Sequence, residues 1–306
     1  METDIHNQGS SFNRLNQNIL YSIGLNLLIV VLEFAGGLIS GSLALLADAM
    51  HNLTDVVALG IAYIARTISR RPPSLNHTYG LRRIEIIAAL VNSIILLIVI
   101  TLILHESVLR LYHPQKIQVG IMFGVGLIGL IANLLSVFLL KNHSHTDLNV
   151  RSAFLLLMQD TLSSVIVVIA ALLSGTTWGL YLDPLASILI ALLVVYGGWD
   201  ILRKAFHVLM EGTPAGLNLV SLQQDIHEHF PEVILHHIHV WEIGSGNHIF
   251  TAHAMVPDIS VSKAEILIKK IHQRLSEKWM IHHATLEMEV QGCGKITLLG
   301  QGKDSH

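Results

Sequence analysis

LALLADAMHNLTDVVALGIAYIA, residues 43–65, decides the fold of this chain. The segment is apolar and long enough to cross a membrane as a helix, yet it carries Asp48, His51 and Asp55. Ionisable groups at bilayer depth are costly, and they persist where they face a bundle interior and handle ions or protons. Spacings of three and four residues put these side chains on one helical face. The pattern therefore predicts the start of a divalent-metal site inside a membrane.

The composition of the whole chain is that of a membrane protein with several spans. Of its 306 residues, 52% are hydrophobic and only 13% are charged, whereas soluble domains carry about a quarter charged residues. The formal net charge of −3 predicts no nucleic-acid partner. The 19 histidines equal the lysines and arginines together, and neutral imidazole binds transition metals. The single cysteine, Cys293, excludes an intramolecular disulfide and a cysteine-cluster metal site.

Six apolar stretches of roughly 20 residues each predict six membrane-spanning helices. They lie near residues 17–39, 42–66, 83–106, 117–140, 152–174 and 182–203. Cytoplasmic segments carry an excess of Lys and Arg, so the basic residues predict the orientation. With both termini in the cytoplasm, only Arg110 and Lys116 lie outside. The inside residues are Arg14, Arg66, Arg70, Arg71, Arg82, Arg83, Lys141, Arg151, Arg203 and Lys204. We therefore predict cytoplasmic N and C termini, with anionic membrane lipid near the basic 67–82 loop.

The character of the chain changes after about residue 208. Residues 219–230 and 261–279 predict helices, and residues 233–243, 247–256 and 284–290 predict strands. The longer helix has one apolar face, formed by Ala264, Leu267, Ile268, Ile271 and Leu275. The order αββαβ predicts a small α+β domain on the cytoplasmic side.

The fold class that we expect is thus an all-α bundle of six transmembrane helices followed by an α+β cytoplasmic domain. The expected division places an N-terminal tail at 1–16, the transmembrane domain at 17–207, the cytoplasmic domain at 208–292 and a tail at 293–306.

Three motifs resemble those of the cation diffusion facilitators. They are SGSLALLADAMHNLTD at 40–55, NHTYGLRRIEIIAAL at 76–90 and QDTLSSV at 159–165, and they occur in the order and in the spans of that family. The resemblance covers residues from about 15 to 290. It implies a homodimeric transporter, not an enzyme, that exports Zn²⁺ or a similar divalent ion in exchange for protons. It also implies a ferredoxin-like cytoplasmic domain, and the short N terminus and fourth loop suggest a bacterial inner membrane.

The resemblance implies a transport site between the second and fifth spans. Zinc-type members have an HxxxD pair on each of these spans, and two imidazoles with two carboxylates suit tetrahedral zinc. His51 and Asp55 match the first pair, and Asp160 matches the acidic half of the second. Leu156 stands where the second histidine is expected, and its side chain cannot bind a metal.

Three interpretations of Leu156 remain open. A three-ligand site of His51, Asp55 and Asp160, completed by water or by Asp48 as a reserve ligand, would be less selective for zinc. Alternatively, the chain is a non-transporting partner subunit or a metal-sensing scaffold. In the third interpretation, Gln159 or Ser163 reaches into the site.

The resemblance also implies a metal site in the cytoplasmic domain. The motifs HHIHVW, TAHAMV and HHATLEME carry the ligand roles onto His236, His253, His282 and Glu289. Neighbouring histidines could substitute, namely His237, His239 and His283. Three imidazoles and a carboxylate suit Zn²⁺ in a structural or regulatory role, and Co²⁺, Cd²⁺, Fe²⁺ and Mn²⁺ are further candidate ions.

Other polar residues in the spans predict helix contacts. Asn133, Ser163 and Ser164 are expected to form interhelical hydrogen bonds. Asp183, followed by Pro184, is expected to cap the start of the sixth span. Glu33, in the outer half of the first span, is a candidate for hydrating the exit path of the ion.

Overall fold

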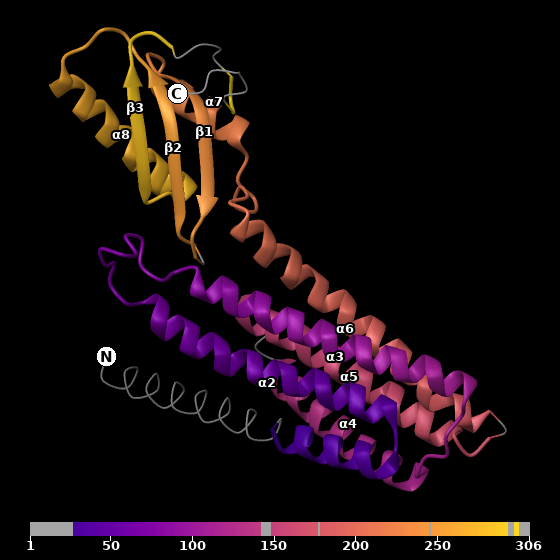
Figure 1. Ribbon diagram of the computed structural model, residues 1–306. Helices are drawn as coiled ribbons and strands as arrows, with labels where there is room; N and C mark the ends of the chain where they lie inside the picture. Colours follow the sequence, from indigo (N-terminus) through magenta and orange to yellow (C-terminus); the bar gives the residue numbers. More distant parts are fainter. Residues whose placement is uncertain (1–26, 142–147, 177, 245, 293–296, 300–306) are drawn as a thin grey trace, which may run out of the picture. The chain divides into compact units, whose positions relative to one another are not determined.

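The computed structural model describes residues 27–141, 148–176, 178–244, 246–292 and 297–299. In this part of the chain, four helices are long and apolar enough to cross a membrane, by length and composition. They are α2 (Leu43–Ser69), α3 (Ile84–Tyr112), α4 (Val119–Lys141, apolar over Val119–Phe138) and α6 (Gly179–Leu209). Two shorter apolar helices are Leu27–Ser40 and Leu157–Leu173, the latter within α5 (Leu148–Leu173). Helices α2 to α6 overlap the predicted second to sixth spans, and α3 and α6 run several residues past the predicted ends (Figure 1). The start of the first predicted span, 17–26, lies outside the described residues.

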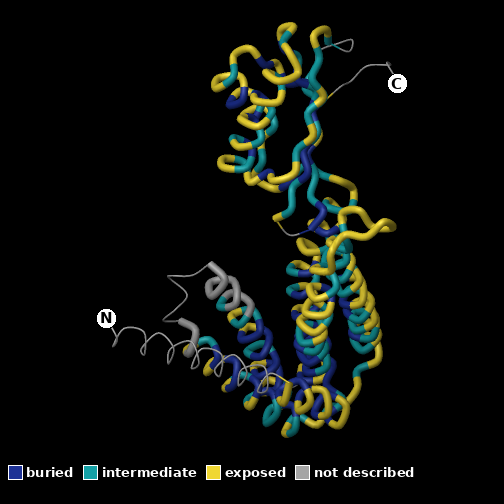
Figure 2. The backbone as a smooth tube through the Cα atoms, turned by 90° about the vertical axis from the view of Figure 1, so that its left-hand side faces the viewer, coloured by how far each residue is buried: buried dark blue, intermediate teal, exposed yellow. Residues whose placement is uncertain are grey.

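The chain forms two compact units. The first contains the residues up to 61 together with 91–201, and the second contains 62–90 and the residues from 202 onward. In the first unit α4 packs along α5. A cluster of small and branched apolar side chains fills the space between the helices. Large apolar side chains such as Leu59, Leu102 and Tyr196 are exposed instead, as expected of helices that face lipid. Figure 2 shows buried and exposed positions alternating along these helices.

Helix α2 is positioned at its start by two caps. Ser42 Oγ accepts a hydrogen bond from the Leu45 amide at 3.1 Å, and the Asp183 carboxylate on α6 accepts from the amides of Leu43 and Ala44 at 2.8 and 3.2 Å. Asp183 also accepts from Ser42 Oγ at 2.5 Å. These contacts satisfy the free amides of the first helical turn.

The prediction that Asp183 caps its own helix was therefore wrong. Helix α6 begins at Gly179, four residues earlier, so Asp183 already lies within the helix and its side chain reaches α2 instead. This contact between α6 and α2 fixes the start of α2, the helix that carries His51 and Asp55.

The cytoplasmic part of the second unit contains α7 (Leu219–His229), β1 (Ile234–Glu242), β2 (His248–Met255), α8 (Val261–Trp279) and β3 (His283–Glu289). This αββαβ order confirms the predicted α+β fold. The sheet order is β1-β2-β3, with β1 antiparallel and β3 parallel to β2. Leu267, Ile271 and Leu275 of the predicted apolar face of α8 are buried in the core of this domain.

Candidate metal centres

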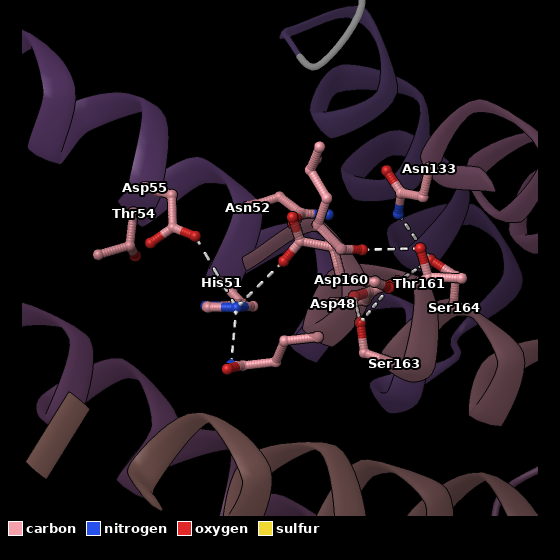
Figure 3. A network of polar contacts seen from close by, with 12 residues as sticks. Asp48, His51, Asn52, Thr54, Asp55, Asn133, Asp160, Thr161, Ser163 and Ser164 are labelled. Carbon is pink, nitrogen blue, oxygen red and sulfur yellow. Dashed lines mark hydrogen bonds and ion pairs between the residues drawn. The ribbon is translucent and has the colours of Figure 1, made fainter. Parts of the chain in front are cut away.

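His51, Asp55 and Asp160 come together inside the first unit. His51 and Asp55 lie one turn apart on α2, and Asp160 reaches them from α5. His51 Nε2 is 3.8 Å from Asp55 Oδ2 and 3.5 Å from Asp160 Oδ1 (Figure 3). One ligand atom from each residue lies within 4.8 Å of the other two. The three residues that the motifs predicted thus form one compact group.

The spacing of these atoms fits a small divalent cation. Two ligand atoms held about 2 Å from one ion at a tetrahedral angle lie roughly 3.3 Å apart, close to the observed separations. His51 and Asp160 are buried, whereas the Asp55 side chain is 46% exposed and leaves the group open on one side. Within the described residues, no Lys or Arg pairs with either carboxylate, and the only imidazole beside them is that of His51. A cation is therefore the natural partner of this cluster.

The amide of Gln159 lies beside this group. Gln159 Nε2 is 3.4 Å from His51 Nε2, so the residue before Asp160 lies at the edge of the group. The amide nitrogen and oxygen are assigned from the surrounding contacts, and turning the amide would present its oxygen to an ion. This placement supports the interpretation in which Gln159 completes the site in the absence of a histidine at position 156.

Asp48 is directed toward hydroxyl groups on α5. Its carboxylate accepts hydrogen bonds from Ser163 Oγ and from Ser164 Oγ, the latter at 3.1 Å (Figure 3). Asn133 of α4 donates to Ser164 Oγ at 3.0 Å, as expected of interhelical contacts between spans. Asp48 is not in the three-residue group, and its role as a reserve ligand stays a prediction.

A second group lies on the sheet of the cytoplasmic domain. His236 of β1, His253 of β2 and Glu289 of β3 bring one ligand atom each within 4.8 Å of the others. Glu289 joins the two imidazoles, because its Oε2 is 3.3 Å from His236 Nε2 and its Oε1 contacts His253 Nδ1. Three strands thus contribute one donor each, which makes the site dependent on the folded sheet.

A bulge in β1 brings a third imidazole to this group. The register between β1 and β2 shifts between His236 and His239, and His237 has a left-handed backbone with φ of 49°. The bulge turns His237 toward the cluster, with its ring centroid 4.8 Å from that of His253. Burial and the charges of His253 and His236 lower the pKa of His237, which favours the neutral, metal-binding form of its ring.

The remaining predicted ligand, His282, lies apart from the group. Its ring is exposed, and its Nδ1 is 2.8 Å from Ser276 Oγ of α8. His239 and His283 are also exposed. Sequence reasoning missed Glu287, whose Oε2 is 3.6 Å from His253 Nε2. Glu287 precedes Glu289 by two positions, and the alternation of side chains along a strand places both on one face.

These features define a class of protein. Apolar spanning helices enclose a cluster of imidazole and carboxylate donors, and a small α+β domain carries a second such cluster. This is the architecture of a membrane protein that handles metal ions, since intramembrane donors of this kind mark ion pathways.

Comparison with known proteins gives the family. Residues 19–210 match the cation efflux transmembrane domain, and residues 214–291 match the cytoplasmic domain of cation efflux proteins. The chain therefore belongs to the cation efflux family, the cation diffusion facilitators that its motifs resemble. It is a metal-cation transporter and not an enzyme.

Several relatives match over nearly their full length. The zinc transporter ZitB of Escherichia coli K12 is 39% identical, and the match covers 95% of this chain and 93% of the relative. The cadmium, cobalt and zinc/H(+)-K(+) antiporter of Bacillus subtilis 168 is 34% identical over 94% of this chain and 91% of the relative. The metal cation efflux system protein CzcD of Cupriavidus metallidurans is 36% identical, and the match covers 86% of this chain and 83% of the relative.

Proposed function

We propose that this protein exports Zn²⁺, or a similar divalent ion, from the cytoplasm in exchange for protons. The observation that carries the proposal is the compact group of His51 and Asp55 on α2 and Asp160 on α5. The names of the relatives support zinc, cadmium and cobalt as candidate ions, and one of these names includes H(+) in an antiporter.

The chemistry of the group explains how exchange works. A metal ion binds neutral imidazole and ionised carboxylates, so protons compete with the ion for the same atoms. On the cytoplasmic side the ion displaces these protons, and on the other side protons displace the ion. Alternating access to the two sides converts this competition into antiport. The site has three strong donors and an amide. It therefore accepts zinc and also other divalent ions that tolerate oxygen ligands.

Transport by purified full-length protein in proteoliposomes tests the proposal. Zn²⁺ uptake driven by a pH gradient is expected for the parent protein, and Asp160→Ala should reduce the initial rate by roughly tenfold or more. Glu106→Gln is the matched control, because Glu106 is a half-exposed carboxylate on α3 that pairs with Arg110. Uptake by Asp160→Ala at the parent rate would contradict the assignment of the site.

The alternative of a non-transporting subunit has less support, because the relatives that match nearly the whole chain are named as transporters. Absence of uptake by the parent protein, with metal still bound to the cytoplasmic domain, would favour that alternative.

We further propose that the cytoplasmic group of His236, His253 and Glu289 binds Zn²⁺ and stabilises a homodimer. The match to a cation efflux cytoplasmic domain and the donor set support this role. The bacterial relatives support a bacterial inner membrane with anionic lipid around the spans, and the basic residues support cytoplasmic termini.

A further inference from the structure

The first described helix, residues 27–40, carries a carboxyl group that neither metal group uses. Glu33 is 1% exposed, and its Oε2 accepts a hydrogen bond from Asn52 Nδ2 of α2 at 3.1 Å. Its other oxygen, Oε1, has no hydrogen-bond partner among the residues that the structure describes. This oxygen lies against the backbone of α4 at Gly129, where a Cβ atom would overlap it. Glu33 is therefore enclosed by protein in the described part of the chain, and its part in the exit path stays a prediction.

The surroundings of Glu33 are unfavourable to a negative charge. The charged groups that act on it are the carboxylates of Asp48 on α2 and Asp160 on α5, and both repel a carboxylate. Neither Lys nor Arg pairs with Glu33 in the described part of the chain. A buried carboxylate with one hydrogen bond and no counter-ion is costly, so the group is expected to hold a proton.

Asp48 shows how an equally buried carboxylate differs. Both oxygens of Asp48 accept hydrogen bonds from serine hydroxyls, which stabilise its negative charge. Glu33 has one amide donor for two oxygens. The negative charge of Glu33 is thus less stabilised by hydrogen bonds than that of Asp48.

We propose that Glu33 is a proton-binding site of the transport cycle, separate from the metal ligands and coupled to them by charge. Asn52 follows the ligand His51 directly on α2, so Glu33 lies close behind the metal group. A dication held there offsets the repulsion by Asp48 and Asp160 and stabilises ionised Glu33, whose proton leaves for the aqueous phase. When the ion leaves, the proton returns. Glu33 would then supply a proton-binding group that Leu156 cannot provide.

This inference rests on the proposed proton exchange, and its test separates the two. Zn²⁺ uptake and proton counterflow are measured together in proteoliposomes containing the full-length protein. We expect Glu33→Gln, which keeps a hydrogen-bonding side chain, to exchange about one proton fewer per ion. Glu106→Gln should keep the parent ratio. A parent protein that moves Zn²⁺ without protons would overturn the proposed function, whereas an unchanged ratio in Glu33→Gln would overturn the role of Glu33 alone.

A second measurement applies if Glu33→Gln folds but does not transport. Infrared difference spectra of the detergent-solubilised protein, with and without Zn²⁺, report the carbonyl band of protonated carboxylic acids. We expect Zn²⁺ to remove such a band in the parent, Glu33→Gln to lack this change and Glu33→Asp to restore it. A band that responds equally in the parent and in Glu33→Gln assigns the proton to another group and rejects the proposal.

Discussion

At the scale of single residues, one position on α5 bears on the ligand set of the proposed transport site. Asp160 lies in the metal group, and Leu156 precedes it by one helical turn. Residues four apart share a helix face, so a histidine at position 156 would be directed to the same side as Asp160. Leucine offers no donor there, and the nearest alternative is Gln159, whose amide is 3.4 Å from His51 Nε2. If Gln159 completes the proposed site, a weak amide ligand stands in place of an imidazole.

Leu156→His should therefore tighten zinc binding. An added imidazole completes a set of two imidazoles and two carboxylates, and it should raise affinity by at least the roughly 10-fold that even an outer-shell partner contributes. Competition between Zn²⁺ and Cd²⁺ in equilibrium dialysis measures both affinity and selectivity. Leu155→His is the matched control, because it places the same side chain one position away from the face of Asp160. If Leu156→His leaves affinity and selectivity unchanged, Leu156 is not a lost ligand.

At the scale of helices and strands, contacts between separate elements hold the donors in place. Asp183 of α6 caps the first turn of α2 by accepting a hydrogen bond from the Leu43 amide. Leu43 precedes His51 by eight residues on the same helix. In the cytoplasmic domain, Asp225 of α7 accepts hydrogen bonds from Arg274 at 3.0 and 2.6 Å, from Lys278 at 2.6 Å and from the indole of Trp279 at 3.0 Å. Both carboxylates join elements that are distant in sequence.

Asp183→Asn should loosen the start of α2. The amide keeps the size of the side chain but replaces one acceptor oxygen with a donor, so the Leu43 and Ala44 amides lose a charged partner. The expected loss is about 1 kcal/mol of helix stability. Hydrogen exchange of the amides at residues 43–46 in the detergent-solubilised protein should become faster, with little change at residues 61–65. Equal exchange in both proteins would show that Ser42 alone caps the helix.

Asp225→Asn should destabilise the cytoplasmic domain and make it less sensitive to acid. Hydrogen bonds from Arg274 and Lys278 lower the pKa of Asp225, so its contribution is complete above about pH 4 and is lost as the pH falls. Because Arg274 and Lys278 are partly exposed, we expect a loss of only about 1 kcal/mol near neutral pH. The measurement is hydrogen exchange of α7 and α8 from pH 7 to pH 3.

The control for this prediction is Glu265→Gln on α8. Glu265 pairs with Lys269, and both side chains are more than half exposed, so the variant should match the parent protein. An acid response in Asp225→Asn equal to that of the parent would assign the pH dependence to another carboxyl group.

At the scale of the whole molecule, two metal groups lie in two separate units of one chain. His51, Asp55 and Asp160 belong to the first unit and open on the side of Asp55, whereas the cytoplasmic group bridges three strands. An open site suits an ion that must leave, and a site that joins strands suits an ion that stays and stabilises the fold.

Metal addition should therefore stabilise the cytoplasmic domain through His236, His253 and Glu289. Zn²⁺ at 100 times its Kd is expected to add about 2.7 kcal/mol of stability, and a chelator should remove it. Hydrogen exchange of β1, β2 and β3 in the full-length protein, with and without Zn²⁺, measures the effect. His253→Ala should abolish the protection, whereas His113→Ala, after α3 and outside both groups, should keep it.

His282→Ala tests the one predicted ligand that the structure places outside the group. Since His282 Nδ1 contacts Ser276 and its ring is exposed, we expect Zn²⁺ protection to remain in this variant. Loss of protection would show that His282 moves to the ion when metal binds, as the family motif predicts.

Much of this protein could be predicted from its sequence, because the relevant patterns are local. Spans follow from runs of apolar residues, and the αββαβ order follows from short-range periodicity. His51 and Asp55 share a face because a helix repeats every 3.6 residues. Motif positions also gave Asp160, His236, His253 and Glu289 as members of the two groups, and the structure brings them together.

Only the tertiary structure decided which distant side chains meet. The sequence placed Asp48 on the same helix face as His51, but packing against α5 directs it to Ser163 and Ser164. Packing likewise carries Asp183 to α2 and encloses Glu33 against Gly129. The physical reason is that helix and strand periodicity depends on neighbours within one turn, whereas the partner of a buried polar group depends on how whole helices pack. Residue spacing therefore identified the candidate metal donors, and packing determined which partners the other buried carboxyl groups have.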